Sequence, residues 1–350
     1  MAKPSFFPSF NTRVVLVLYR LIWAVCLPLV IFFLYWRGKK EPAYFKFLAE
    51  RFGRHKLRDK SHIWIHAVSL GEVRSAVPLI KRLLLDDTPV VITHFTPAGR
   101  SAIMRLFPDA VADGRLTACY VPFDYSAAFR RFFKAFRLVY GLVMEVEFWP
   151  GMIMSSRKYG VPLYLCNGQY PSRSFERDLQ RFFSRAKIVP GFAGVMVKSE
   201  LQAARFRMLG IDRVAITGEM RFDQPIPQAH IAAARTFRTA AMGARPVITM
   251  ASMVVGEDVS ALDMIAQVQS QFVQRGLEKP LFIYVPRAPE RFDVVAEIIA
   301  EKSFSYAKRS DVLDALLQIK SEIGNAETNV AKTDINGLDI VLGDSLGEMY

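Results

Sequence analysis

The segment Ile63–Val73 reads Ile-Trp-Ile-His-Ala-Val-Ser-Leu-Gly-Glu-Val and combines a β-strand, a tight turn and the start of an α-helix. Its apolar first half is typical of a buried strand, and the Ser-Leu-Gly-Glu sequence that follows is typical of a helix N-terminus. From residue 62 onward, similar short runs alternate with longer helical patterns, which predicts parallel sheets covered by crossover helices. We therefore expect an α/β fold.

Two series of strands are predicted, separated by the proline-containing stretch Gln224–Pro227, which indicates a domain boundary. The first series is His62–Val68, Val90–His94, Thr117–Val121, Leu138–Met144, Pro162–Cys166, Val195–Lys198 and Val214–Thr217. The second series is Val247–Ala251, Leu281–Val285, Phe304–Ala307 and Asp339–Leu342. A doubly wound half has five or six strands, so we expect the second domain, which stops at Tyr350, to be incomplete.

Length and composition limit the class of protein. A chain of 350 residues exceeds the usual size of one domain, so two domains of roughly 150 residues are expected. Apolar residues make up 51% of the chain, which excludes a disordered protein. The formal net charge of +13 indicates an anionic partner: nucleic acid, an acidic membrane surface or a phosphorylated substrate. Three cysteines without paired spacing indicate neither a disulfide framework nor a zinc site.

The N-terminal segment Val14–Trp36 has the properties of a membrane anchor. It is 23 residues long with Arg20 as its only charge, which is close to what a bilayer-spanning helix needs. The free energy gained by inserting its apolar residues into a bilayer exceeds the cost of inserting Arg20, which lies near one end of the segment. The basic residues at 37–40 place the bulk of the protein on the cytoplasmic side. A monotopic interfacial helix bent at Pro28 is the alternative.

Glu72 is the first candidate for chemistry, because it lies just beyond the C-terminal end of the first predicted strand, where parallel sheets bind ligands. Ser69 and Glu72 also have the spacing of a capping box, in which both side chains close the first turn of a helix. On spacing alone, capping is favoured over catalysis. A hydrolase nucleophile elbow at Ala67–Gly71 is a further alternative, but its triad needs a late histidine, and only His230 is available.

Two further segments place charged side chains just beyond predicted strands. Val143–Gly151 carries Glu145 and Glu147 on one face; paired acids suit proton transfer, and they suit the anchoring of helix N-termini or sugar hydroxyls equally well. Arg221 and Arg287 follow later strands. Arg offers a fork of donors that fits phosphate, although an ordinary exposed Arg is the commoner case.

Other patterns are weaker indicators of function. The loop Gly343–Glu348 follows a strand and has the glycines of a ligand-binding loop. The basic, aromatic segment Phe129–Arg137 favours the core face of a crossover helix over a lipid-headgroup site. The five histidines do not cluster, so no metal site is expected. Nucleic-acid binding is not expected either, because no recognition motif accompanies the basic residues.

Taken in order, these segments resemble the 3-deoxy-D-manno-octulosonic acid (Kdo) transferases, glycosyltransferase family 30, which move Kdo from CMP-Kdo onto lipid A precursors in lipopolysaccharide synthesis. No single segment is decisive, but the ordered set is highly specific. The similar segments are Tyr19–Arg20 with Glu50–Gly53, Trp64–Glu72, Thr93–Gly99, Val121–Asp124, Met144–Pro150, Arg221–Asp223, Val285–Arg287 with Pro289–Phe292, and Gly343–Glu348.

The resemblance implies a GT-B fold, in which two Rossmann-like domains face a cleft, and an inverting mechanism without metal or cofactor. Glu72 matches the family's proton acceptor, and Glu145 and Arg221 match positions assigned to transition-state stabilisation. The positions that match CMP-binding residues are Pro286, Arg287, Leu346, Gly347 and Glu348. The implied parts of the chain are a membrane anchor at 1–40, an acceptor domain at 41–222 and an incomplete donor domain at 223–350.

The implied partners are a lipid A precursor, the CMP-sugar and the lipids of the inner membrane, with the catalytic domains on the cytoplasmic face; the oligomeric state stays open. The sequence departs from the family pattern, which usually has His at Ala288, Asn at Glu219, Arg at Gln169 and Lys at Arg221. The family also continues past Tyr350 with a His-Asn-Pro motif, so C-terminal truncation is expected. Two alternatives follow: a divergent paralogue that transfers another sugar acid, and a non-catalytic membrane scaffold.

Overall fold

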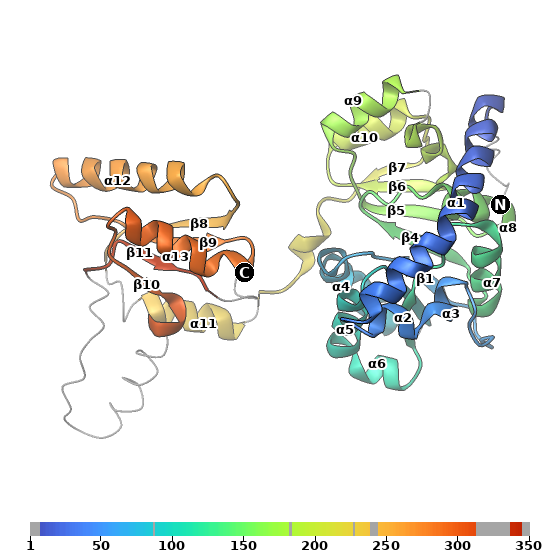
Figure 1. Ribbon diagram of the computed structural model, residues 1–350, viewed down its shortest axis with the longest axis horizontal. Helices are drawn as coiled ribbons and strands as arrows, with labels where there is room; N and C mark the ends of the chain where they lie inside the picture. The colour runs from blue at the N-terminus through green and yellow to red at the C-terminus, as the bar shows by residue number, and fades with distance from the viewer. Residues whose placement is uncertain are drawn as a thin grey trace. The chain divides into compact units, whose positions relative to one another are not determined.

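The computed structural model describes residues 8–86, 88–181, 184–226, 228–238, 244–312 and 337–344. The chain forms two compact units, unit 1 (Met1–Gln224) and unit 2 (Pro225–Tyr350) (Figure 1). The division falls in the proline-containing stretch, two residues past the predicted bound at 222. Each unit contains a parallel β-sheet with helices. The predicted α/β class is therefore confirmed.

Unit 1 is built on a seven-stranded parallel sheet in the order β3-β2-β1-β4-β5-β6-β7. At its centre, Ile63 of β1 pairs with Val90 of β2 on one side and with Tyr140 of β4 on the other. The strands are β1 (Ile63–His66), β2 (Val90–His94), β3 (Leu116–Tyr120), β4 (Tyr140–Met144), β5 (Leu163–Gly168), β6 (Gly194–Val197) and β7 (Val214–Ile216). The strand order reverses between β1 and β4, as it does in doubly wound folds.

Helices cover both faces of this sheet, because successive side chains of a strand point to opposite faces. Ile63 and Ile65 pack in one core with α4, α5 and α6, whereas Trp64 packs in a second core with α7 to α10. The helices are α4 (Leu70–Leu85), α5 (Pro97–Leu106), α6 (Pro108–Ala112), α7 (Ser126–Phe136), α8 (Pro150–Tyr159), α9 (Ser172–Gln180) and α10 (Glu200–Met208). The result is three layers, helix on sheet on helix.

Helix α7 contains most of the basic, aromatic segment Phe129–Arg137. Its side chains Phe129, Phe132 and Phe136 have no exposed surface and surround Trp64 or one another. The phenylalanines therefore form the core face of a crossover helix, as predicted.

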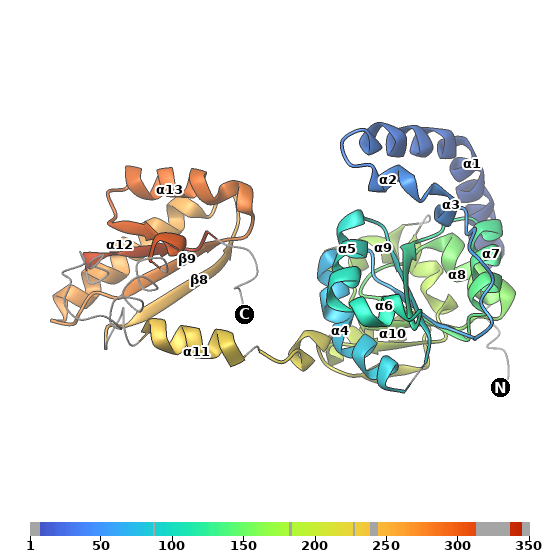
Figure 2. The same cartoon turned by 90° about the horizontal axis from the view of Figure 1, so that it is seen from below.

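Helix α1 (Phe10–Gly38) is long and apolar enough to cross a membrane, and in the described part of the chain no other helix meets that test. The short helices α2 (Ala43–Lys46) and α3 (Leu48–Arg51) connect it to β1. Figures 1 and 2 show α1 lying across the outside of unit 1. Its Leu16 side chain is buried in the core that contains α7. The apolar segment predicted as an anchor is thus also packed on the unit.

Unit 2 has a four-stranded parallel sheet in the order β10-β11-β9-β8. Leu262 and Ile265 of α12 and Ile299 of α13 are buried against Phe282 and Tyr284 of β9. The elements are α11 (Gln228–Phe237), β8 (Val247–Met253), α12 (Asp258–Gln274), β9 (Leu281–Pro286), α13 (Phe292–Glu301), β10 (Tyr306–Lys308) and β11 (Ile340–Leu342). All eleven strands in the described part of the chain lie within two residues of their predicted bounds.

Replacing Gly53 by Ala is expected to destabilise unit 1 strongly. Gly53 has φ +72°, and an added Cβ would lie 2.0 Å from the carbonyl oxygen of Ala128 in α7. Gly160 is the matched control, because it has φ +75° with open space around its Cβ position. We expect G160A to cost about 1–2 kcal/mol and G53A to lower the melting temperature well beyond that. Circular dichroism of the full chain in detergent measures both, and equal melting temperatures would contradict the prediction.

Candidate active site

The C-terminal edge of the unit 1 sheet collects Glu72, Glu145 and Arg221, three of the residues that the sequence singled out. Strands β1 and β4 are adjacent and parallel, so both end at this edge. The chain leaves β1 through α4 towards β2 on one side, while β4 continues through α8 towards β5 on the other. Ligands of doubly wound folds bind at such a reversal of strand order. Glu72 lies in the first turn of α4, the helix that follows β1, and Glu145 directly follows β4.

Glu72 belongs to the first turn of α4 and is 8% exposed. Ser69 Oγ accepts a hydrogen bond from the Glu72 amide at 3.2 Å, and Glu72 Oε2 accepts one from the Val68 amide at 2.6 Å. The predicted capping is therefore present, with the carboxyl group bonded to the residue before the N-cap. Burial raises the pKa of Glu72 to about 7; the Val68 hydrogen bond opposes this shift, and the negative charges of Glu147 and Glu145 add to it.

Glu145 and Glu147 have different partners. Glu145 is 9% exposed, and its carboxylate accepts hydrogen bonds from Gln169 Nε2 at 3.2 Å and from Arg221 Nη2 at 3.3 Å. Glu147 accepts one from Trp149 Nε1 at 2.5 Å, and burial raises the pKa of Glu147. Glu145 also has φ +55°. A non-glycine residue in the left-handed region is uncommon, and such residues cluster at functional sites.

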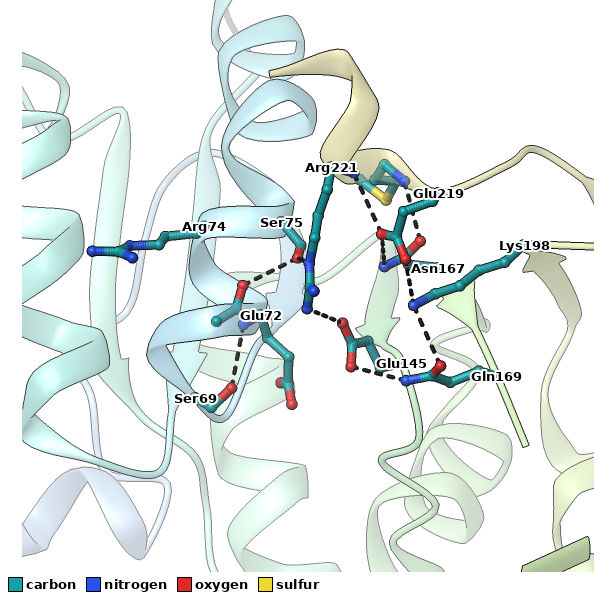
Figure 3. Close-up of polar contacts among 12 residues, drawn as sticks. Ser69, Glu72, Arg74, Ser75, Glu145, Asn167, Gln169, Lys198, Glu219 and Arg221 are labelled. Carbon is teal, nitrogen blue, oxygen red and sulfur yellow. Dashed lines mark hydrogen bonds and ion pairs between the residues drawn. The ribbon is translucent and has the colours of Figure 1, made fainter. Parts of the chain in front are cut away.

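Arg221 bridges α4 and the end of β4 from the short helix η3 (Met220–Asp223). Its Nε donates to Ser75 Oγ at 2.8 Å, and its Nη2 pairs with Glu145 at 3.3 Å. Figure 3 shows Arg221 between Ser75 and Glu145, while Arg74 points away from them. The Arg221 side chain is 55% exposed. Its remaining N–H groups are therefore accessible to a ligand.

Sequence reasoning missed the polar network that holds η3 in place. Lys198 Nζ pairs with Glu219 at 2.6 Å and donates to Gln169 Oε1 at 3.4 Å. Asn167 donates to Glu219 at 2.7 Å and accepts from the Met220 amide at 3.2 Å. Asn167 and Lys198 lie at the C-terminal ends of β5 and β6, the same edge that Glu72 and Glu145 share. Polar residues at strand ends were the signal that could have found them.

Two of the predicted CMP-binding positions, Pro286 and Arg287, lie in the described part of unit 2. Pro286 is buried at the end of β9, and the exposed Arg287 follows it, with its amide bonded to the Met253 carbonyl at 2.9 Å. Arg291, also in the motif, forms a buried ion pair with Asp258 and donates to the Met253 carbonyl at 2.7 Å. Arg291 is thus part of the framework of unit 2, whereas Arg287 points its charge to solvent.

The predicted residues Leu346, Gly347 and Glu348 lie outside the part of the chain that the structure describes. Among the described residues, no group of three His, Cys, Asp or Glu side chains gathers to hold a metal ion. Burial lowers the pKa of His66 to about 3 and that of His94 to about 4, so both rings are neutral.

The cluster in unit 1 combines a buried carboxyl group of raised pKa with a cation. A carboxyl group with a pKa near 7 suits a general base at neutral pH, and Glu72 is such a group. An Arg beside it stabilises negative charge that develops during a reaction. The hydrolase alternative loses support, because Ser69 Oγ accepts the hydrogen bond of the Glu72 amide at the N-cap of α4.

Comparison with known proteins identifies the family. A family model described as 3-deoxy-D-manno-octulosonic-acid transferase (kdotransferase) matches residues 46–224. The chain is 31% identical over 327 residues to a 3-deoxy-D-manno-octulosonic acid transferase of Bordetella pertussis. This alignment covers 92% of this chain and 71% of that protein. The chain is 28% identical over 344 residues to the protein of the same name from Haemophilus influenzae, with 95% and 72% covered.

Among solved structures, a UDP-GlcNAc 2-epimerase from Neisseria meningitidis bound to UDP-GlcNAc aligns with a TM-score of 0.45 and 11% identity, over 69% of this chain and 70% of that one. The match to the family model includes all seven strands of the unit 1 sheet, and the match to the Bordetella protein extends over most of the chain. The chain therefore belongs to the 3-deoxy-D-manno-octulosonic-acid transferase family of glycosyltransferases.

Proposed function

We propose that this chain transfers Kdo from CMP-Kdo to a lipid A precursor, with inversion at the anomeric carbon and with Glu72 as the base. The observation that carries the proposal is the buried Glu72 carboxyl group, whose pKa is raised to about 7, at the reversal of strand order beside Glu145 and Arg221. Membership of the family supports the class of reaction.

Glu72 takes the proton of the acceptor hydroxyl while the hydroxyl oxygen forms a bond to the anomeric carbon of Kdo. The bond from that carbon to the CMP phosphate oxygen breaks, and its electron pair leaves with CMP. The proton then passes from Glu72 to solvent. A carboxyl group of ordinary pKa is a weak base, so the raised pKa of Glu72 strengthens proton transfer at neutral pH. The Val68 amide orients the carboxyl group by its hydrogen bond.

Arg221 stabilises negative charge in the transition state. Ser75 and Glu145 each hold one edge of its guanidinium, so the group is oriented before substrate binds. Such preorganised charges stabilise a transition state without reorganisation during the reaction. Glu145 acts through Arg221 in this scheme, because its carboxylate is occupied by Arg221 and Gln169.

CMP binds at the C-terminal edge of the unit 2 sheet. Arg287 lies just past the end of β9 with an exposed side chain, which suits a phosphate. Pro286, and Leu346, Gly347 and Glu348 outside the described residues, complete the proposed CMP contacts. The proposed reaction uses no metal or cofactor, since arginines offset the charge of the departing CMP.

Helix α1 holds the enzyme at the cytoplasmic face of the inner membrane, where a lipid acceptor is available. Its apolar side chains Leu21, Val25 and Leu29 are exposed, which suits contact with lipid. Because α1 also packs on unit 1 through Leu16, we favour a helix that lies in the membrane interface over one that spans it alone.

Replacing Glu72 by Gln is expected to abolish most transfer while the fold remains. Gln can still accept the Val68 hydrogen bond and close the turn, but it cannot take a proton. We expect kcat to fall by roughly 10²- to 10⁴-fold, with an unchanged melting temperature. The rate of transfer from CMP-Kdo to a lipid A precursor at saturating substrate gives kcat. Undiminished transfer by E72Q would remove Glu72 from this role.

The pH dependence of kcat/KM should have an acidic limb near pH 7, because Glu72 must lose its proton to act and its pKa is raised to about 7. Glu147 adds to this shift by its negative charge, so Glu147→Gln should lower the pKa of Glu72 and move the limb to lower pH. The exposed Glu176 gives the control E176Q, which should leave the limb in place. An acidic limb at the same pH in the wild type, E147Q and E176Q would contradict the assignment of this limb to Glu72.

Titration with CMP tests the donor site separately from turnover. CMP should raise the melting temperature of the chain, and Arg287→Ala should weaken its binding by roughly tenfold or more, as expected for loss of a charge-assisted hydrogen bond. The exposed Arg275 at the end of α12 gives the control R275A, with wild-type affinity. A chain with no response to CMP would favour the non-catalytic scaffold. Equal CMP affinity in R287A would remove Arg287 from the site.

A further inference from the structure

A pocket of about 520 Å³ lies between α1 and the body of unit 1. Trp23, Val30 and Leu34 of α1 line one side of it, and Phe95 and Phe123, which follow β2 and β3, line the other. The volume falls in the range of roughly 300–1,000 Å³ that is typical of small-molecule sites. We call this space the α1 pocket.

The α1 side of the pocket is held by specific contacts. Tyr19 Oη donates to Asp124 Oδ2 at 2.6 Å, and Trp23 Nε1 donates to Tyr19 Oη at 2.6 Å. The rings of Trp23 and Phe123 lie 6.1 Å apart. Leu16 is buried in the core of the unit. The pocket is therefore a built feature of unit 1 rather than a space beside a loosely attached helix.

The surroundings of the pocket indicate an amphiphilic occupant. The outer side of α1 exposes a series of apolar side chains, among them Val17, Leu21, Val25 and Leu29, which suits contact with lipid. Arg37, near the C-terminal end of α1, also lines the pocket and is exposed with its guanidinium over the Tyr44 ring at 4.9 Å. A mostly apolar lining, which also contains the buried Asp124 and Arg51, fits an acyl chain, and the exposed Arg37 fits an anionic head group.

The pocket also adjoins the candidate active site. The Phe95 amide bonds to the Val68 carbonyl at 3.3 Å, and the Val68 amide bonds to the Glu72 carboxyl group. Trp149, another lining residue, lies 6.2 Å from Phe95 between ring centroids and donates to Glu147. The pocket wall and the proposed base are thus supported by the same backbone segments.

We propose that the α1 pocket binds an acyl chain of the lipid acceptor and so positions the acceptor hydroxyl at Glu72. This inference rests on the proposed function, since it assigns the lipid part of the same acceptor. The pocket sets affinity for acylated acceptors, and α1 is part of the binding site as well as an anchor.

Replacing Val30 by Trp fills the pocket, and Val25→Trp adds the same side chain to the exposed side of α1. Each methylene of an acyl chain that is buried in the pocket raises affinity roughly fourfold. If the Trp side chain of V30W displaces two or more of these methylenes, the KM for a lipid A precursor should rise roughly tenfold or more. Transfer to the deacylated precursor should be the same in V30W and wild type, and V25W should match wild type with both acceptors. An unchanged KM for the acylated acceptor in V30W, or equal losses with both acceptors, would overturn the proposal.

Photolabelling of the unmodified chain tests the pocket without turnover. The probe is a lipid A precursor with a diazirine in one acyl chain, and cross-links are mapped by mass spectrometry in detergent micelles. Labelling of Val30, Leu34, Phe95 or Phe123 that persists with excess phosphatidylethanolamine supports the proposal. Labelling confined to Leu21, Val25 and Leu29, or removed by the phospholipid, would overturn it. If transfer itself is absent, the proposed function fails while this labelling still decides the pocket.

Discussion

All strands of unit 1 run parallel, so all seven end at one edge of the sheet, and the order of the strands reverses at that edge between β1 and β4. This single constraint gathers residues that are far apart in the sequence. Glu72, Glu145 and Lys198 follow β1, β4 and β6, Asn167 lies at the end of β5, and Arg221 reaches them from η3 after β7. The loops on either side of the reversal diverge, which is why ligands bind there in folds of this kind.

Opposing forces act on Glu72 at this edge. The N-terminus of α4 and the Val68 amide favour an ionised carboxylate. Burial and the charges of Glu147 and Glu145 favour the protonated form, and they outweigh the hydrogen bond, so the pKa rises to about 7. In the described part of the chain no cation pairs with Glu72; Arg221 pairs with Glu145 instead. An Arg bound to Glu72 itself would lower the pKa and weaken the base.

Asp124 connects this edge to α1. It is buried, its Oδ2 accepts hydrogen bonds from Tyr19 Oη and the Gly151 amide, and its Oδ1 accepts one from the Met152 amide. Burial raises the pKa of Asp124 to about 6, and these hydrogen bonds oppose the shift. One carboxyl group therefore holds both α1 and the start of α8, directly after Trp149. Helix α1, the α1 pocket and the candidate active site share this support.

The sequence by itself determined the α/β class and the strands found among the described residues, because apolar periodicity and turn residues are local properties of the chain. The ordered motifs also indicated Glu72, Glu145 and Arg221. Only the tertiary structure decided that Ser75 and Lys198 support the cluster, that Arg291 is a framework residue, and that Glu72 titrates near neutral pH. Each of these depends on which side chains from distant segments cover a group, and burial and charge proximity are set by packing rather than by sequence spacing.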